Sequence, residues 1–267
     1  MAPQPSRKDP TLPHTIASAR QEWQAFWLAL GFLTRVPMLI RIEYTQTLMN
    51  QSSVYFPLIG LLLGAVYAGL FSALSLLFSP LICLIMVVSA HLWLTGAFHE
   101  DGLADSMDAL GGGYTVEARL HIMKDSRIGT YGTVALVLAL ALKVALLMET
   151  SNIGLALLIS PCLARLTPLV LMRCMNYVTD PDTSKSKPVA EGFSRQRLWA
   201  AFAFAALVAL AAEPWAPGLL TWSALSIGLV AWLWGRNLKQ NLGGYTGDAL
   251  GASVVFTELA LLACLTV

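Results

Sequence analysis

Long apolar runs alternate with short polar stretches along most of the chain. Runs of roughly 17 to 25 residues, enough to cross about 30 Å of hydrocarbon as helices, stand at 54–78, 81–98, 131–149, 154–172, 198–213, 217–235 and 248–267. Backbone groups in lipid must be hydrogen-bonded within their own segment, so each run is predicted to be a helix. The shorter apolar stretch 23–34 is predicted to be an interfacial or re-entrant helix. The pattern therefore predicts an all-α, polytopic integral membrane helical bundle with about seven transmembrane helices.

Composition supports this class. Hydrophobic residues make up 56% of the 267 residues and charged residues only 12%, with a mean hydropathy of +0.64. A soluble domain usually carries about 25% charged residues. Residues 1–22 are rich in proline and polar side chains and are predicted to be a flexible tail. Residues 23–267 are predicted to form a single membrane-embedded catalytic domain.

Lysine and arginine gather in every second connection between the predicted spans. All but two of the 17 basic residues lie before the first span or in the connections after the second, fourth and sixth. By the positive-inside rule, the amino terminus and the long loops face the bacterial cytoplasm, and the carboxyl terminus lies outside the inner membrane. The exceptions, Lys143 and Arg165, lie within spans, where a charge suggests a functional site. Arg165 is expected to face a polar cavity, whereas snorkelling or pairing with Glu149 remains open for Lys143.

The stretch "HEDGLADSMDAL", residues 99–110, places four carboxylates directly after the second apolar run. If the helix continues past His99, Asp101, Asp105 and Asp108 fall within about 60° of one another, because a helix turns about 100° per residue. Like charges at this spacing are slightly destabilising without a cation. Oxygen ligands favour a hard ion such as Mg²⁺ or Mn²⁺. These three aspartates are therefore predicted to be metal ligands with a catalytic role.

Alternatives remain for this stretch. An acidic cluster can simply end a transmembrane helix in water. His99 is a candidate catalytic base, and the alternative is a histidine that only forms hydrogen bonds at the interface. Glu100 points about 100° away from Asp101 and is a weaker candidate ligand.

Two glycine-bearing turns, "KDSRIGTYG" and "GGYTGDALG", share the predicted cytoplasmic side with the acidic stretch. Glycine lets a backbone approach a ligand closely, and exposed amides at a helix start favour phosphate oxygens. Asp125 and Asp248 are expected to complete the metal shell. The alternatives are helix-capping loops and ordinary interfacial charges. The residues predicted to contact substrate or phosphate are Arg35, Lys124, Arg127, Gly129, Arg165, Thr246 and Gly247.

The chain resembles the cobalamin synthase family, the adenosylcobinamide-GDP ribazoletransferases. The similarity covers nearly the whole chain through blocks in a fixed order: "GFLTRVP", "YFPLIGLLLG", "GAFHEDGLADSMDALGGG", "IMKDSRIGTYG", "LARL" and "GGYTGDALGA". Relatives commonly have leucine at the position of Glu100, which argues against Glu100 as an essential ligand. The family pattern commonly has glycine after the third aspartate, where this chain has Ala109.

The resemblance implies a reaction and its components. A hydroxyl of α-ribazole, or of α-ribazole 5′-phosphate, would attack the cobinamide-linked phosphoryl group of adenosylcobinamide-GDP and release GMP. The implied cofactor is Mg²⁺, and the implied surroundings are the lipid bilayer without nucleic acid. The resemblance also allows a homo-oligomer or an association with other corrinoid-assembly enzymes. The loop 175–197 matches the family least clearly.

Two rival functions are weighed against this one. CDP-alcohol phosphotransferases also carry an aspartate-rich helix, but their pattern has arginine where this chain has Asp105, and its last two aspartates are four residues apart rather than three. A cation or solute transporter would place the acidic motif near the middle of a span and would often contain internal repeats. No such repeat is visible in the sequence.

Overall fold

The computed structural model describes residues 18–178 and 194–266, and these form an all-α bundle. Its amino-terminal part contains α1 (Ala19–Leu33), α2 (Gln46–Ser52), the 3₁₀ turn η1 (Ser53–Tyr55), α3 (Phe56–Leu74), α4 (Pro80–Thr95), α5 (Phe98–Gly112) and α6 (Val116–Ile122). Its carboxyl-terminal part contains α7 (Thr130–Glu149), α8 (Ile153–Ala164), α9 (Leu166–Cys174), α10 (Arg195–Ala212), α11 (Leu219–Asn241) and α12 (Gly247–Cys264).

All seven predicted apolar runs fold as helices. Five helical segments are long and apolar enough to cross a membrane, and the bent pair α4 and α5 raises the number to six if it counts as one span. Helix α11 is long but falls short of this apolar threshold, since tryptophan, serine and threonine interrupt its aliphatic side chains. The chain is therefore a polytopic helical membrane protein.

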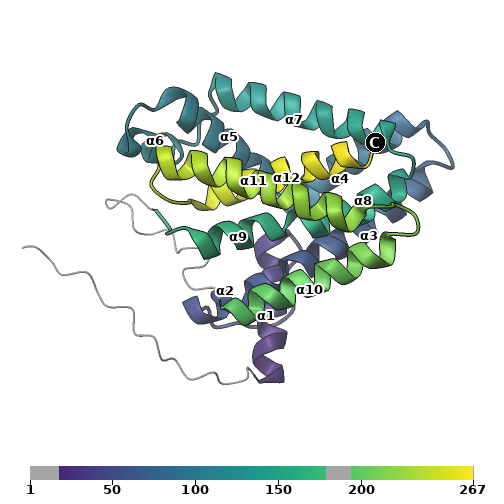
Figure 1. Cartoon of the computed structure of the whole chain (residues 1–267), viewed down its shortest axis with the longest axis horizontal. Helices are drawn as coiled ribbons and strands as arrows, with labels where there is room; N and C mark the ends of the chain where they lie inside the picture. Colours follow the sequence, from purple (N-terminus) through teal and green to yellow (C-terminus); the bar gives the residue numbers. More distant parts are fainter. Residues whose placement is uncertain (1–17, 179–193, 267) are drawn as a thin grey trace, which may run out of the picture.

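Helix α1 lies across the bundle in Figure 1, as expected for the predicted short amino-terminal helix. Arg197 at the start of α10 pairs with Glu22 of α1, which also accepts a hydrogen bond from the Tyr55 hydroxyl at 2.8 Å. The predicted tail boundary at residue 22 is wrong, because Ser18 caps α1 and the helix begins at Ala19. Residues 1–17 of that predicted tail lie outside the described residues.

Two breaks shape the interior of the bundle. Helices α4 and α5 are bent by 86° at Gly96 and Ala97. Helices α8 and α9 form one span that is interrupted at Arg165, between Pro161 and Pro168. Proline lacks the amide N–H that continues a helix.

Helix α12 occupies the centre of the bundle. It contacts α5, α7, α8, α9 and α11, and most of its side chains are buried. Figure 1 shows the starts of α7 and α12 at the end of the molecule that carries α6, while the carboxyl terminus lies at the opposite end. This arrangement brings α5 and both glycine-bearing turns to one end of the bundle.

Candidate active site

Helix α5 begins after a sharp turn of the backbone. Gly96 has a left-handed φ of 69°, and Ala97 follows with a φ of 55°. A left-handed conformation costs a residue with a side chain about 1–2 kcal/mol, so packing must hold Ala97 in place. Arg35 supports the turn, since its N–H donates to the Leu94 carbonyl at 2.7 Å and its guanidinium lies against Gly96. The prediction that the second span continues straight past His99 is therefore wrong.

The three aspartates of α5 nevertheless share one helical stripe. Asp101 is exposed, Asp105 is half-buried and Asp108 is buried. Asp248, in the first turn of α12, joins them because α5 and α12 pack closely at Gly102. A Cβ at Gly102 would lie 2.6 Å from the Asp248 carbonyl oxygen.

Three of these carboxylates form a surface that we call the aspartate face, defined by Asp101, Asp105 and Asp248. Asp105 experiences the negative charges of Asp101, Asp248 and Asp108. Within residues 18–178 and 194–266, no lysine or arginine forms an ion pair with any carboxylate of the aspartate face. Neighbouring carboxylates without counter-charges attract a cation.

Asp108 has a different environment from the other two aspartates of the stripe. Its two carboxylate oxygens accept hydrogen bonds from the backbone N–H groups of Gly129 at 2.6 Å and Gly132 at 2.8 Å. These amides belong to the start of α7, where a negative charge is stabilised by the helix dipole. A Cβ at Gly129 would lie 2.5 Å from an Asp108 oxygen, so only glycine fits. The helix entrance predicted to bind phosphate through Gly129 thus binds the protein's own carboxylate.

The loop before α7 carries three of the predicted site residues. Arg127 is largely exposed, and its guanidinium donates to both oxygens of Asp125 at distances between 2.6 and 3.1 Å. These hydrogen bonds hold the pKa of Asp125 down at about 2. Lys124 is exposed in the same loop. Asp125 makes no hydrogen bond or ion pair with the aspartate face in the part of the chain that the structure describes, and its predicted role as a metal ligand stays a prediction.

The second glycine-bearing turn leads into α12. The Thr246 hydroxyl caps the helix by accepting from the Ala249 N–H at 3.1 Å. Tyr245 exchanges backbone hydrogen bonds with the segment after α9, donating to Asn176 and accepting from Val178, each at 2.9 Å. These contacts fix the position of Gly247, the first residue of α12, beside the aspartate face.

His99 and Arg165 lie together in a separate pocket. The imidazole of His99 points about 160° away from Asp101 around α5. Arg165 is only 1% exposed, and the pocket that it shares with His99 is also lined by Gly247, Gly251 and the side chains of Phe32 and Phe56. The expectation that Arg165 faces a cavity is confirmed, although most of the lining is apolar.

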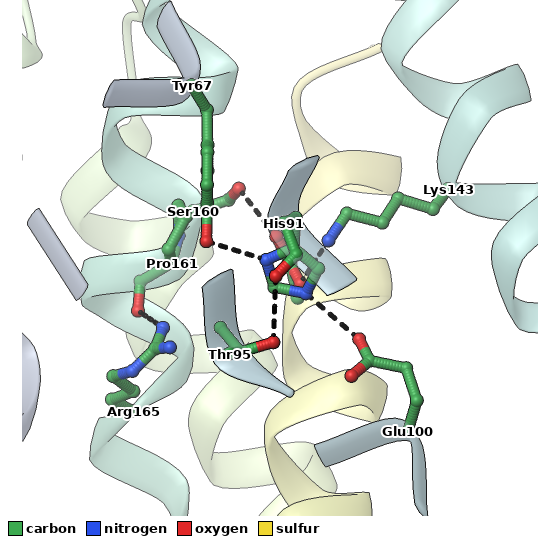
Figure 2. A network of polar contacts seen from close by, with 9 residues as sticks. Tyr67, His91, Thr95, Glu100, Lys143, Ser160, Pro161 and Arg165 are labelled. Atoms are coloured by element: carbon green, nitrogen blue, oxygen red, sulfur yellow. Dashed lines mark hydrogen bonds and ion pairs between the residues drawn. The ribbon is translucent and has the colours of Figure 1, made fainter. Parts of the chain in front are cut away.

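A network of buried polar side chains underlies α5 and was missed by sequence reasoning (Figure 2). His91 accepts or donates through both ring nitrogens, to Tyr67 at 2.8 Å and to Glu100 at 3.0 Å. Lys143 donates to Glu258 at 2.9 Å, so neither snorkelling nor pairing with Glu149 describes it. The signal was available, since Lys143 and Glu258 are opposite charges within two apolar spans.

A preformed metal cage is not present among the described residues: no three His, Cys, Asp or Glu side chains lie close enough to hold an ion by themselves. Mg²⁺, however, is usually bound through one or two carboxylates together with waters and substrate phosphates. The uncompensated oxygens of the aspartate face therefore fit this ion, with room left for a substrate.

Comparisons with known proteins agree with this arrangement. The family model for cobalamin-5-phosphate synthase matches residues 25–266. A relative from Shewanella halifaxensis, named adenosylcobinamide-GDP ribazoletransferase, is 43% identical over 90% of this chain and 95% of the relative. A relative of the same name from Vibrio cholerae is 41% identical over 92% of this chain and 94% of the relative. No solved structure matches the chain significantly. The match over nearly the full length shows that the chain belongs to the cobalamin-5-phosphate synthase family.

Proposed function

We propose that this chain is an adenosylcobinamide-GDP ribazoletransferase. A hydroxyl of α-ribazole, or of its 5′-phosphate, attacks the cobinamide-linked phosphorus of adenosylcobinamide-GDP. The new P–O bond forms as the bond to GMP breaks, and the products are GMP and adenosylcobalamin or its 5′-phosphate. The observation that carries this proposal is the full-length family match, together with the aspartate face at one end of the bundle.

The aspartate face is proposed to bind the diphosphate of the donor through Mg²⁺. Asp101, Asp105 and Asp248 are the side chains that would hold the ion, and Asp108 contributes by fixing α5 against α7. Bound there, the ion would neutralise the diphosphate and stabilise charge on the leaving GMP. The carboxylates keep the site oriented, because they project from two helices that are locked together at Gly102.

Basic and amide groups around this face are proposed to hold phosphate oxygens. Lys124 and Arg127 lie on the exposed loop before α7, and Gly247 presents the start of α12. Phosphoryl transfer depends mainly on positioning and electrostatics, so such groups are sufficient for most of the catalysis. Arg35, beside the turn into α5, is placed to act at the edge of the same site.

His99 is proposed to accept the proton of the attacking hydroxyl. It lies in the first turn of α5 and lines the pocket next to Gly247, whose neighbour in sequence is Asp248. A base in this position is close to the aspartate face without being a ligand of the metal.

For the membrane arrangement we propose seven spans in the bacterial inner membrane. The carboxyl-terminal residues would lie outside and the amino terminus inside, with the active site facing the cytoplasm. Support comes from the basic residues, which follow or precede helix ends at the α6 end of the bundle, and from the opposite position of the carboxyl terminus (Figure 1). α1 would lie at the cytoplasmic interface.

The function is tested with the full chain in liposomes. Supplied with Mg²⁺, adenosylcobinamide-GDP and α-ribazole or its 5′-phosphate, it should release one GMP for each complete corrinoid formed. A CDP-linked lipid donor tests the rival phosphotransferase activity in parallel. Release of CMP from that donor, with no GMP from the corrinoid, would overturn the proposal.

A further inference from the structure

Arg165 has hydrogen-bonding capacity that the protein does not use. Its NH1 group donates to the Pro161 carbonyl at 2.6 Å, where the break after α8 leaves that oxygen accessible (Figure 2). Its Nε and NH2 groups are buried and have no hydrogen-bond partner in the part of the chain that the structure describes. Unsatisfied buried donors of a charged group cost several kcal/mol. A guanidinium buried in this way is expected to receive a partner from outside the chain.

The nearby carboxylates do not fill this role. Glu258 is bound by Lys143 and Ser160, and the bonded oxygen of Glu100 faces His91. Neither carboxylate forms a hydrogen bond with Arg165 among the described residues. The polar network therefore reaches the neighbourhood of Arg165 but leaves one edge of its guanidinium open.

The open edge lines the pocket that also contains His99, Gly247 and Gly251. The enclosed part has a free volume of about 20 Å³, which is room for one water molecule or one phosphate oxygen. Together with its open mouth the space reaches about 350 Å³. The adjacent Nε and NH2 groups of an arginine match two oxygens of a phosphate or carboxylate. The first turn of α12 adds a second preference for an anion, because amides at a helix start are unpaired.

The position of the pocket relative to the aspartate face decides which anion it takes. Gly247 lines the pocket, whereas Asp248, the next residue, belongs to the aspartate face. His99 and Asp101 likewise lie on opposite sides of α5. A ligand in the pocket is thus next to the donor's diphosphate but not on the same surface, which is the position that an acceptor must occupy.

We propose that Arg165 binds the phosphate group of a phosphorylated acceptor, α-ribazole 5′-phosphate, in a subsite separate from the aspartate face. The proposal rests on the transferase function proposed above and assigns that enzyme a preference for the phosphorylated acceptor. Its apolar surroundings strengthen the pairing, because few water molecules compete for the two charges. The unphosphorylated acceptor leaves Arg165 without its partner and is bound more weakly.

The test compares both acceptors with the full chain in liposomes. Wild-type protein should show a higher kcat/KM for α-ribazole 5′-phosphate than for α-ribazole. Arg165→Gln should lower kcat/KM for the phosphorylated acceptor about 100-fold, as for other buried charge pairs that lose one partner. With α-ribazole its activity should stay within about threefold of wild type. Arg165→Lys should regain part of the preference, because it restores the charge without the two-pronged geometry.

Arg41→Gln serves as the matched control, since Arg41 is exposed and lies outside the proposed site. Equal losses with both acceptors in Arg165→Gln and Arg165→Lys would overturn the subsite. That result would point to a lipid phosphate, a water molecule or a structural role for the guanidinium. Should Arg165→Gln not fold, the ratio of the two acceptors in Arg165→Lys decides. Absence of GMP release by wild type with either acceptor would instead refute the transferase function itself.

Discussion

Asp108 and Asp105 lie on the same stripe of α5, and the structure predicts opposite consequences when each is replaced by asparagine. Asp108 accepts two short hydrogen bonds from α7 and is only 9% exposed. In Asp108→Asn one acceptor oxygen becomes an NH₂ group that faces a backbone N–H. The loss of one charge-assisted bond and the unsatisfied donor together cost about 3 kcal/mol. Asp105 has no such bond in the described residues, so Asp105→Asn only removes a repelling charge.

The assay is thermal unfolding in detergent, followed by tryptophan fluorescence. A loss of about 3 kcal/mol corresponds to a fall in Tm of about 6–12 °C for a chain of this size. Asp108→Asn should show this fall. Asp105→Asn should keep the wild-type Tm within about 2 °C or raise it, while losing transferase activity. Equal Tm values for the two variants would refute the role of Asp108 as the link between α5 and α7.

Three further predictions concern the packing and the metal. Lys143→Met should destabilise the protein by about 3–5 kcal/mol, because it leaves Glu258 buried without its cation; the double variant with Glu258→Gln should recover part of that loss in the same unfolding assay, and an additive loss would argue against the pair. Gly102→Ala should lower GMP release by forcing α5 away from α12, whereas Gly69→Ala, which meets nothing within 4 Å, should not; equal activities would contradict the close packing. Chelation with EDTA should stop GMP release and added Mg²⁺ should restore it, and activity that persists without divalent ions would remove the metal from the proposal.

Much of the fold follows from local sequence features. The apolar runs specify the helices because lipid leaves their backbone groups no other partner. Residues such as Ser18, Thr246 and Asn152 cap helices in the expected way, since a side-chain oxygen can accept from the free amides of the first turn. The stripe of aspartates on α5 was predictable for a similar reason, because helical phase depends only on spacing.

Other features depend on partners that are distant in the sequence. The turn at Ala97 needs support from Arg35, and no local pattern indicates a left-handed alanine. Asp108 looked like a third metal ligand because its spacing matches, but its orientation is decided by the amides of α7. The same holds for Glu100, whose partner His91 lies on the preceding helix. Spacing predicts which residues share a helix face, whereas tertiary packing decides what that face meets.

The most direct test of the aspartate face as the donor site is GMP release by single-residue variants under saturating Mg²⁺ and acceptor. Asp105→Asn and Asp248→Asn should each lower the rate at least about 100-fold, as expected when a group that holds a catalytic ion is lost. Asp125→Asn should remain within about threefold of wild type, because Asp125 pairs with Arg127 on the exposed loop. Wild-type rates in Asp105→Asn and Asp248→Asn, or an equal loss in Asp125→Asn, would contradict the assignment.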